Sequence, residues 1–134
     1  MLERLEVQSL GIIDRVSLEL TDGFVALTGE TGAGKSLLVE SLKLLAGDRA
    51  QSEMIRSGDD RLRVEAVFVT AREGRLAAVL DELGIEPEGT MVIRREFTSA
   101  GRTRCWVNDV PVTVGALQRL APELLAIHGQ HEQY

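Results

Sequence analysis

The clearest chemical signal in the chain is the segment Gly29-Glu30-Thr31-Gly32-Ala33-Gly34-Lys35-Ser36. It matches the phosphate-loop pattern, in which a glycine, four residues of any type and Gly-Lys precede a serine or threonine. Its glycines allow the backbone to turn its amide groups inward, where they can surround a phosphate. Lys35 would then reach the β- and γ-phosphates, and the Ser36 hydroxyl would bind Mg²⁺. The pattern predicts a nucleoside triphosphate as the ligand.

A strand and a helix are predicted on either side of this segment. Residues 24–28 form a short apolar run that is typical of a central strand covered on both faces. Residues 35–46 have leucines at helical spacing and no proline, and Gly47 follows where a left-handed C-cap would lie. This context favours phosphate binding because a helix directs its positive N-terminal end at the anion. A glycine-rich turn without a ligand is the ordinary alternative.

The rest of the chain alternates strands with short helices. Alternating apolar residues predict strands over residues 3–10, 13–20, 62–68, 91–98 and 103–108. The last two flank Ser99-Ala100-Gly101-Arg102, the best hairpin signal in the chain. Residues 111–120 are interpreted as a turn leading into a helix, and residues 124–127 as a last buried strand. With no repeat or linker, residues 1–134 are expected to form one domain.

Residues 76–82 end in Asp81-Glu82, as does the strand that supplies acidic residues in many phosphate-loop ATPases. However, Leu76, Val79, Leu80 and Leu83 recur at helical spacing. We therefore predict an amphipathic helix over residues 73–83, closed by Gly84. A GTPase is disfavoured because no Asn-Lys-x-Asp motif for guanine occurs.

The C-terminal residues offer two candidate sites. His128 and His131 could share a helical face and hold a metal, but no third ligand is in view, because Cys105 lies on a predicted strand and Glu132 is a surface-type residue. Gln130 follows the predicted strand at residues 124–127, near the phosphate loop, where its amide could bind Mg²⁺ and orient an attacking water. The ordinary alternative is a polar tail at the end of a chain.

Four arginines gather on the predicted hairpin: Arg94, Arg95, Arg102 and Arg104. They are typical of a solvated sheet face paired to acids such as Glu96, and contact with a nucleic-acid phosphate backbone is the alternative. The 15 basic and 21 acidic residues give a net charge of −6, which argues against a domain that coats nucleic acid with its whole surface. Trp106 is interpreted as a core or interface residue rather than a platform for stacked bases.

The composition bounds the class of protein. With 134 residues, 44% hydrophobic and 27% charged, the chain is expected to fold as one compact domain. We expect a soluble, cytoplasmic protein without a membrane partner, because no apolar stretch is long enough for a bilayer and no signal peptide opens the chain. The single cysteine, Cys105, cannot form an internal disulfide.

Three segments together carry a family resemblance: residues 29–36, the hairpin from Arg94-Arg95 to Gly101-Arg102 with Val107-Asn108, and Ile127-His128-Gly129-Gln130-His131-Glu132. Over nearly the whole chain, the sequence resembles the N-terminal head segment of the RecN family of bacterial DNA repair proteins. That family is similar to the structural-maintenance-of-chromosomes (SMC) proteins and the ABC ATPases. In these proteins two halves, separated by a long antiparallel coiled coil, fold into one head. The resemblance implies an α/β P-loop NTPase fold, the N-terminal lobe of an ABC/SMC-type head, with a mixed sheet and an antiparallel β subdomain.

The resemblance also implies roles for particular residues. ATP would bind to residues 29–36, with Lys35 on the phosphates and Ser36 on Mg²⁺. Gln130 would be the glutamine of the so-called Q-loop, a second Mg²⁺ ligand and, with Lys35, a catalytic residue; Gln133 is a weaker candidate. The implied partners are the C-terminal half of the same head, a second head with ATP between the two, and DNA, so that the complete protein would be associated with the nucleoid.

Three features of that family do not occur in residues 1–134: a Ser-Gly-Gly signature, an Asp-Glu strand and heptads. We therefore expect this segment alone to bind nucleotide weakly and to hydrolyse it negligibly. Two other functions stay open at this stage. One is a small phosphate-loop kinase, which would need a lid with converging arginines. The other is a non-catalytic module in which nucleotide only stabilises the fold or an interface.

Overall fold

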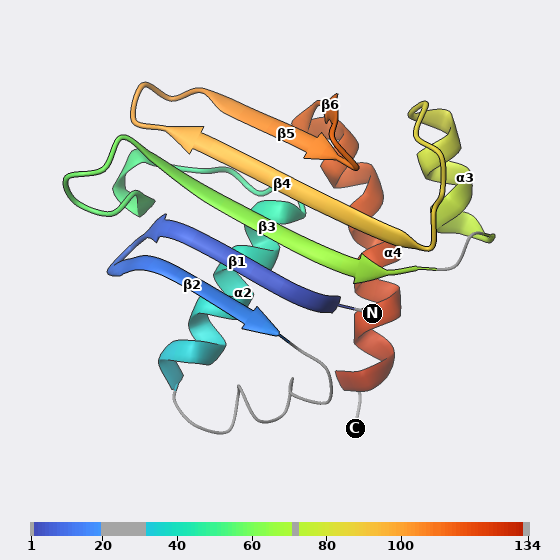
Figure 1. Cartoon of the computed structure of the whole chain (residues 1–134), viewed down its shortest axis with the longest axis horizontal. Helices are drawn as coiled ribbons and strands as arrows, with labels where there is room; N and C mark the ends of the chain where they lie inside the picture. Colours follow the sequence, from blue (N-terminus) through green and yellow to red (C-terminus); the bar gives the residue numbers. More distant parts are fainter. Residues whose placement is uncertain (1, 20–31, 71–72, 133–134) are drawn as a thin grey trace.

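The computed structural model describes residues 2–19, 32–70 and 73–132, and for residues 32–35 and 124–132 it describes the backbone alone. Its described strands form one antiparallel sheet in the order β2-β1-β3-β4-β5-β6 (Figure 1). The strands are β1 (Leu2–Leu10), β2 (Ile13–Glu19), β3 (Arg61–Val69), β4 (Thr90–Thr98), β5 (Thr103–Val107) and β6 (Val110–Val112). The predicted antiparallel β subdomain is thereby confirmed.

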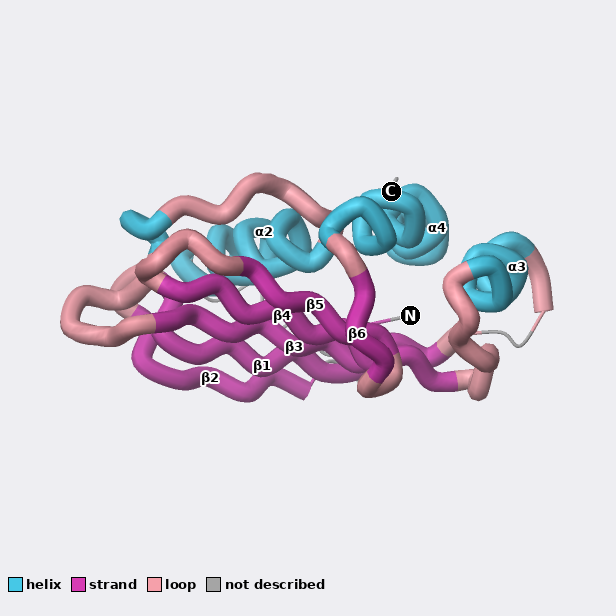
Figure 2. Tube along the Cα trace, turned by 90° about the horizontal axis from the view of Figure 1, so that it is seen from above, coloured by secondary structure: helices cyan, strands magenta, loops and turns pink. Residues whose placement is uncertain are grey.

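In the part of the chain that the structure describes, helices lie against one face of the sheet and not against the other. Figure 2 shows α2 (Gly32–Leu45) and α4 (Val114–Glu132) on the same side of the sheet. The short helix α3 (Arg75–Glu82) lies beyond one end of the strands, and the 3-10 helix η1 (Ser52–Met54) follows α2 in the chain. We call the side that carries α2 and α4 the covered face and the other side the open face. Within the described residues, no helix is both long enough and apolar enough to cross a membrane.

Alternation along each strand assigns the side chains to these faces. On β3, Leu62, Val64 and Ala66 are fully buried, whereas the intervening Arg63 and Glu65 are partly exposed. The same period of two continues on β4, which pairs with β3 over nine consecutive positions, from Arg61 opposite Thr98 to Val69 opposite Thr90. The covered face therefore holds the core, where leucines of α2 and α4 pack on the strands. These strands and helix α2 confirm the sequence predictions.

The prediction of a strand at residues 124–127 is wrong, because these residues continue helix α4. The helix is anchored by the buried Leu117 and Leu120, and the apolar residues Leu124 and Ile127 follow at spacings of four and three. A short apolar run fits a strand or a helix equally well, so its neighbours decide. Pro122 lies inside the helix and removes one backbone donor without ending it. The other strand predicted near the phosphate loop, residues 24–28, lies outside the described residues.

Residues 111–120 are predicted to form a turn into a helix, and the structure differs in having a three-residue strand, β6, before that helix. Asn108 and Asp109 both have positive φ angles, 49° and 66°, and form the tight turn between β5 and β6. Such turns suit asparagine and aspartate. β6 is the last strand in the described order and contains Pro111, and a proline is tolerated in a strand mainly at a sheet edge.

Candidate nucleotide-binding site

Helix α2 begins inside the phosphate-loop pattern, at Gly32. The first four backbone N–H groups of an α-helix have no partner within the helix, and its dipole is positive at that end. These groups belong here to Gly32, Ala33, Gly34 and Lys35, and the first turn contains no acidic residue. The start of α2 is therefore built to receive an anion such as a phosphate.

The predicted ligand residues are described to different extents. Gly29, Glu30 and Thr31 lie outside the described residues, and for Gly32 to Lys35 only the backbone is described. Ser36 is exposed near the start of the helix. Hydroxyl oxygen is a ligand that Mg²⁺ accepts. The described residues thus fit a phosphate with its magnesium ion, and the role of each remains a prediction.

The candidate residues near the C-terminus lie in α4. The backbone of His128, Gln130 and His131 is helical, so the prediction that Gln130 stands at the end of a strand is wrong. Their side chains and Gln133 lie outside what the structure describes. Within the described residues there is no group of three or more His, Cys, Asp or Glu that could hold a metal ion.

The prediction of a helix that ends in Asp81-Glu82 is confirmed. Helix α3 buries Leu76, Ala77 and Leu80 and leaves Asp81 and Glu82 exposed. The Glu82 carboxylate accepts a hydrogen bond from the guanidinium of Arg119 on α4. These acidic residues thus stand on a solvent-exposed helix face rather than at the end of a central strand.

The hairpin arginines divide between the two faces of the sheet. Arg94 lies on the open face, where its guanidinium carbon is 4.4 Å from the centroid of the half-buried Trp106 ring and its Nη1 is 3.7 Å from Oε1 of Glu65. Arg102 and Arg104 are exposed. Arg95 points to the covered face and is only 3% exposed, so its proposed contact with nucleic acid is wrong. The period of two, applied to Met91, Ile93 and Phe97, would have predicted this burial.

Arg95 binds backbone carbonyls at the C-terminal end of α2. Its Nη1 donates hydrogen bonds of 2.6 Å to the carbonyl oxygens of Leu44 and Asp48, and its Nε donates to Oγ1 of Thr103 at 3.1 Å. Burial lowers the pKa of Arg95, while Cys105 and Asp48 nearby raise it. On α4, Nε2 of Gln118 donates to the carbonyl oxygen of Gly47 at 3.1 Å. The spacing of residues predicts the C-cap at Gly47, but not that Arg95 and Gln118 donate to carbonyls at this end of α2.

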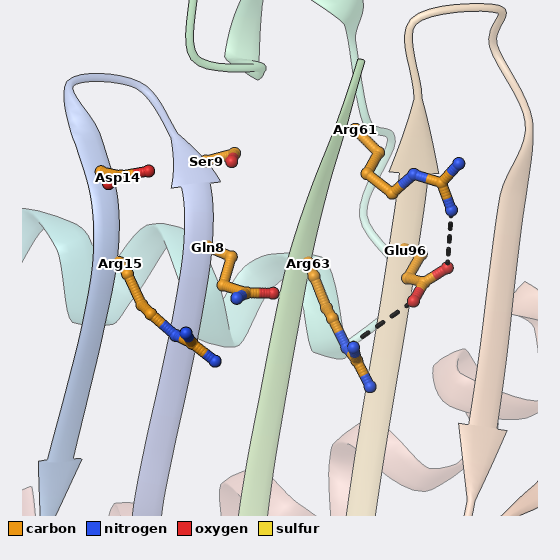
Figure 3. Close-up of a pocket in the computed structure, with 7 residues that line it drawn as sticks. All are labelled: Gln8, Ser9, Asp14, Arg15, Arg61, Arg63 and Glu96. Atoms are coloured by element: carbon orange, nitrogen blue, oxygen red, sulfur yellow. Dashed lines mark ion pairs between the residues drawn. The ribbon is translucent and has the colours of Figure 1, made fainter. Parts of the chain in front are cut away.

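A hollow of about 370 Å³ lies on the open face, and Figure 3 shows the side chains that line it. It is lined by Gln8, Ser9, Asp14, Arg15, Arg61, Arg63 and Glu96. Glu96 pairs with both Arg61 and Arg63, at 3.7 and 3.6 Å. The prediction of a solvated sheet face paired to acids holds for Arg94, which pairs with Glu65. The predicted pairing of Glu96 with the hairpin arginines is wrong, because its partners Arg61 and Arg63 stand on β3. The hollow lies on the open face, whereas α2 lies on the covered face (Figure 2).

A family model described as "AAA domain" matches residues 4–120. The chain belongs to the AAA domain family. This AAA domain is similar to the DNA repair protein RecN of Halalkalibacterium halodurans, with 37% identity over 133 residues that cover 98% of the chain and 24% of that protein. RecN of Streptomyces coelicolor is 41% identical over 130 residues, which cover 96% of the chain and 23% of that protein. The chain thus spans about a quarter of the length of these relatives.

Solved structures show the fold of this AAA domain. A structure from work on the ATP-driven dimerization and DNA stimulated activation of SMC ATPases has a TM-score of 0.66 and 22% identity, covering 90% of this chain and 77% of that one. The SMC head domain from Thermotoga maritima has a TM-score of 0.60 and 18% identity, covering 88% and 41%. The AAA domain therefore has the fold of an SMC-type head, as the resemblance implied.

Proposed function

We propose that residues 1–134 form the ATP-binding, N-terminal lobe of the head of an SMC-like ATPase that acts in DNA double-strand-break repair and recombination. The observation that carries this proposal is the start of α2 within the phosphate-loop pattern, which puts Lys35 and Ser36 in its first turns. The RecN relatives are DNA repair proteins by name, and they support the biological role. The protein would work in the cytoplasm, associated with the nucleoid.

Each residue of the site would have a definite task. The backbone amides from Gly32 onward would bind the phosphates of ATP, with Lys35 neutralising the outer two. The Ser36 hydroxyl and the Gln130 amide would hold Mg²⁺, and Gln130 would also orient the attacking water. Magnesium, when bound, withdraws charge from the phosphate oxygens.

The remaining parts of the site would come from partners. The C-terminal half of the same head would supply a signature and an acidic strand, and two heads would close with ATP between them. ATP-driven dimerization is described for one SMC structure of this fold. DNA would bind to the complete protein, and the exposed Arg102 and Arg104 are the hairpin residues free to contact it. A kinase lid is disfavoured because Arg94 and Arg95 point to opposite faces of the sheet.

Titration with ATP and Mg²⁺ tests the nucleotide site in the complete polypeptide that carries this chain. Lys35→Ala should weaken ATP binding by roughly tenfold or more, because it removes a charge-assisted contact to phosphate. The matched control is Lys43→Ala, which changes the other lysine, exposed in the last turn of the same helix. Equal affinities of the two variants would overturn the proposed site.

Two further measurements address hydrolysis and DNA. Residues 1–134 alone should turn over ATP no faster than their Lys35→Ala variant, and faster turnover would contradict a divided head. In the complete protein, joint replacement of Arg102 and Arg104 by alanine should flatten the salt dependence of DNA affinity. An unchanged slope of affinity against salt would mean that Arg102 and Arg104 do not contact the DNA phosphates.

A further inference from the structure

The C-terminal end of α2 is bound by side chains of two other elements, β4 and α4. We call this arrangement the α2 clasp and define it by Leu44, Gly47, Asp48, Arg95 and Gln118. Arg95 donates to the carbonyl oxygens of Leu44 and Asp48, both at 2.6 Å, and Gln118 donates to that of Gly47 at 3.1 Å. Carbonyls at a helix C-terminus have no partner within the helix, so these side chains supply donors where they are needed.

The backbone of α2 ends in a tight geometry at the α2 clasp. Gly47 N–H donates to the Leu44 carbonyl at 3.1 Å, and Asp48 N–H donates to the Lys43 carbonyl at 3.0 Å, which is the Schellman pattern. Gly47 has a φ of +95°, and a Cβ at this position would lie 2.5 Å from Cγ of Gln118. Helix α4 thus approaches the end of α2 so closely that only glycine fits without a shift.

An arginine is unusual at position 95, because this position is buried among apolar side chains. Its neighbours on the covered face of β4 are Ile93 and Phe97, and an apolar residue would continue the core between them. Within the described residues Arg95 forms no ion pair with a carboxylate, although the charge of Asp48 lies near enough to raise its pKa. A buried cation costs desolvation energy that apolar packing avoids, so such residues often serve specificity rather than stability. Its charge does face the negative end of the α2 dipole.

We infer that Arg95 is a positioning residue for the nucleotide site: it fixes α2 along its axis and so sets the place of the phosphate-binding first turn. This inference rests on the proposed function. Helix α2 has 14 residues and is about 21 Å long at 1.5 Å per residue. Because a hydrogen-bonded helix of this length moves as a rod, a slide at the α2 clasp displaces the amides of Gly32 to Lys35 equally. A misplacement of about 1 Å can lower the rate of a reaction about a hundredfold. We expect such a displacement of the amides to weaken their contacts with the phosphates as well.

Affinity for ATP with Mg²⁺, measured in the complete polypeptide well below the unfolding temperature of each variant, tests the inference. Arg95→Met should bind ATP roughly tenfold or more weakly. Arg95→Lys should recover part of the loss, because an ammonium group keeps the charge but not the planar set of donors. Amide exchange in α2 should be faster in Arg95→Met than in the wild type, while exchange in β1 and β3 is unchanged.

Two control variants separate positioning from loss of stability. Ile93→Val lowers stability through the same strand without touching the α2 clasp, and Arg63→Met removes an arginine from the open face, where it pairs with Glu96. Both should bind ATP as the wild type does. If Arg95→Met does not fold, Arg95→Lys and Thr103→Val carry the test, since Thr103 accepts a hydrogen bond from Arg95.

The outcomes are distinguishable. If the wild type binds ATP and both Arg95 variants bind it equally well, the positioning role is overturned and the proposed function stands. An equal loss in Ile93→Val would also overturn it, because general destabilisation would then explain the effect. If the wild type binds ATP no more tightly than Lys35→Ala does, the proposed function is overturned. The inference about Arg95 is then overturned as well, because it rests on that function.

Discussion

Arg94 and Arg95 are neighbours in the sequence, yet they belong to two different regions of the molecule. On the open face, Arg94 is partly exposed and lies over Trp106 beside Glu65. On the covered face, Arg95 is buried, and its Nη1 donates to two backbone carbonyl oxygens. The side chain is the same, but the strand's period of two gives one arginine a surface ion pair and the other a link to α2. Position on the strand, rather than residue type, therefore decides what each arginine does.

The two faces should also differ in what they contribute to stability. The covered face removes large apolar side chains from water, each worth a few kcal/mol, whereas exposed ion pairs typically contribute less than about 1 kcal/mol. The described ion pairs of the strands lie on the open face, as those of Arg63 and Arg94 illustrate. Substitutions on adjacent residues of one strand can test this difference directly.

The largest effect is expected from the covered face of β3. Leu62→Ala should lower the free energy of unfolding by about 2–5 kcal/mol, because Leu62 is fully buried and the truncation leaves a cavity. Urea denaturation measures the change. The matched control is Arg63→Ala, one residue further along on the open face, which should cost about 1 kcal/mol or less. Similar losses for the two variants would contradict the division of the sheet into two unequal faces.

A smaller effect is expected on the pH dependence of the free energy of unfolding, and it should come from Cys105. This residue pairs in register with Arg95 and is buried on the covered face. Burial raises the pKa of the Cys105 thiol, and nearby Arg95 opposes this in part. The folded protein therefore keeps the thiol proton to higher pH than the unfolded chain, whose thiol ionises near pH 8.5. This contribution to stability is fully present below about pH 8.5 and is lost as the pH rises through the higher pKa of the thiol in the folded state.

The measurement compares urea denaturation of the wild type and Cys105→Ala at several values between roughly pH 7 and 10. The free energy of unfolding of the wild type should fall more steeply above about pH 8.5 than that of the variant. Parallel curves would mean that the thiol is not shielded on the covered face.

Local sequence was enough to predict most elements that surround the candidate site. The hairpin between β4 and β5, the glycine C-cap of α2 and the helical nature of residues 76–82 all follow from spacing over a few residues. The error at residues 124–127 has the same origin, because four apolar residues do not distinguish a strand from a helix. Only the continuation from Val114 into a 19-residue helix decides the matter.

The α2 clasp could not be predicted in this way. Arg95 and Leu44 are 51 residues apart in the chain, and Gln118 and Gly47 are 71 apart. Which carbonyl a buried arginine meets depends on how α2 crosses the sheet, and that is set by packing of the whole core. The phosphate-loop pattern differs because its ligands are consecutive residues, so its chemistry can be recognised before the fold is known.

The smallest effect is expected at Glu96, which faces the hollow on the open face and pairs with Arg61 and Arg63 at 3.7 and 3.6 Å. Glu96→Gln keeps the size of the side chain and removes its charge, so the free energy of unfolding should fall by about 0–1 kcal/mol. Because salt screens surface charges over about 3 Å at 1 M, that loss should shrink when denaturation is repeated at high salt. The Leu62→Ala loss should not shrink, since it comes from apolar burial. A salt-independent loss at Glu96 as large as that at Leu62 would mean that the open face contributes to stability as the covered face does.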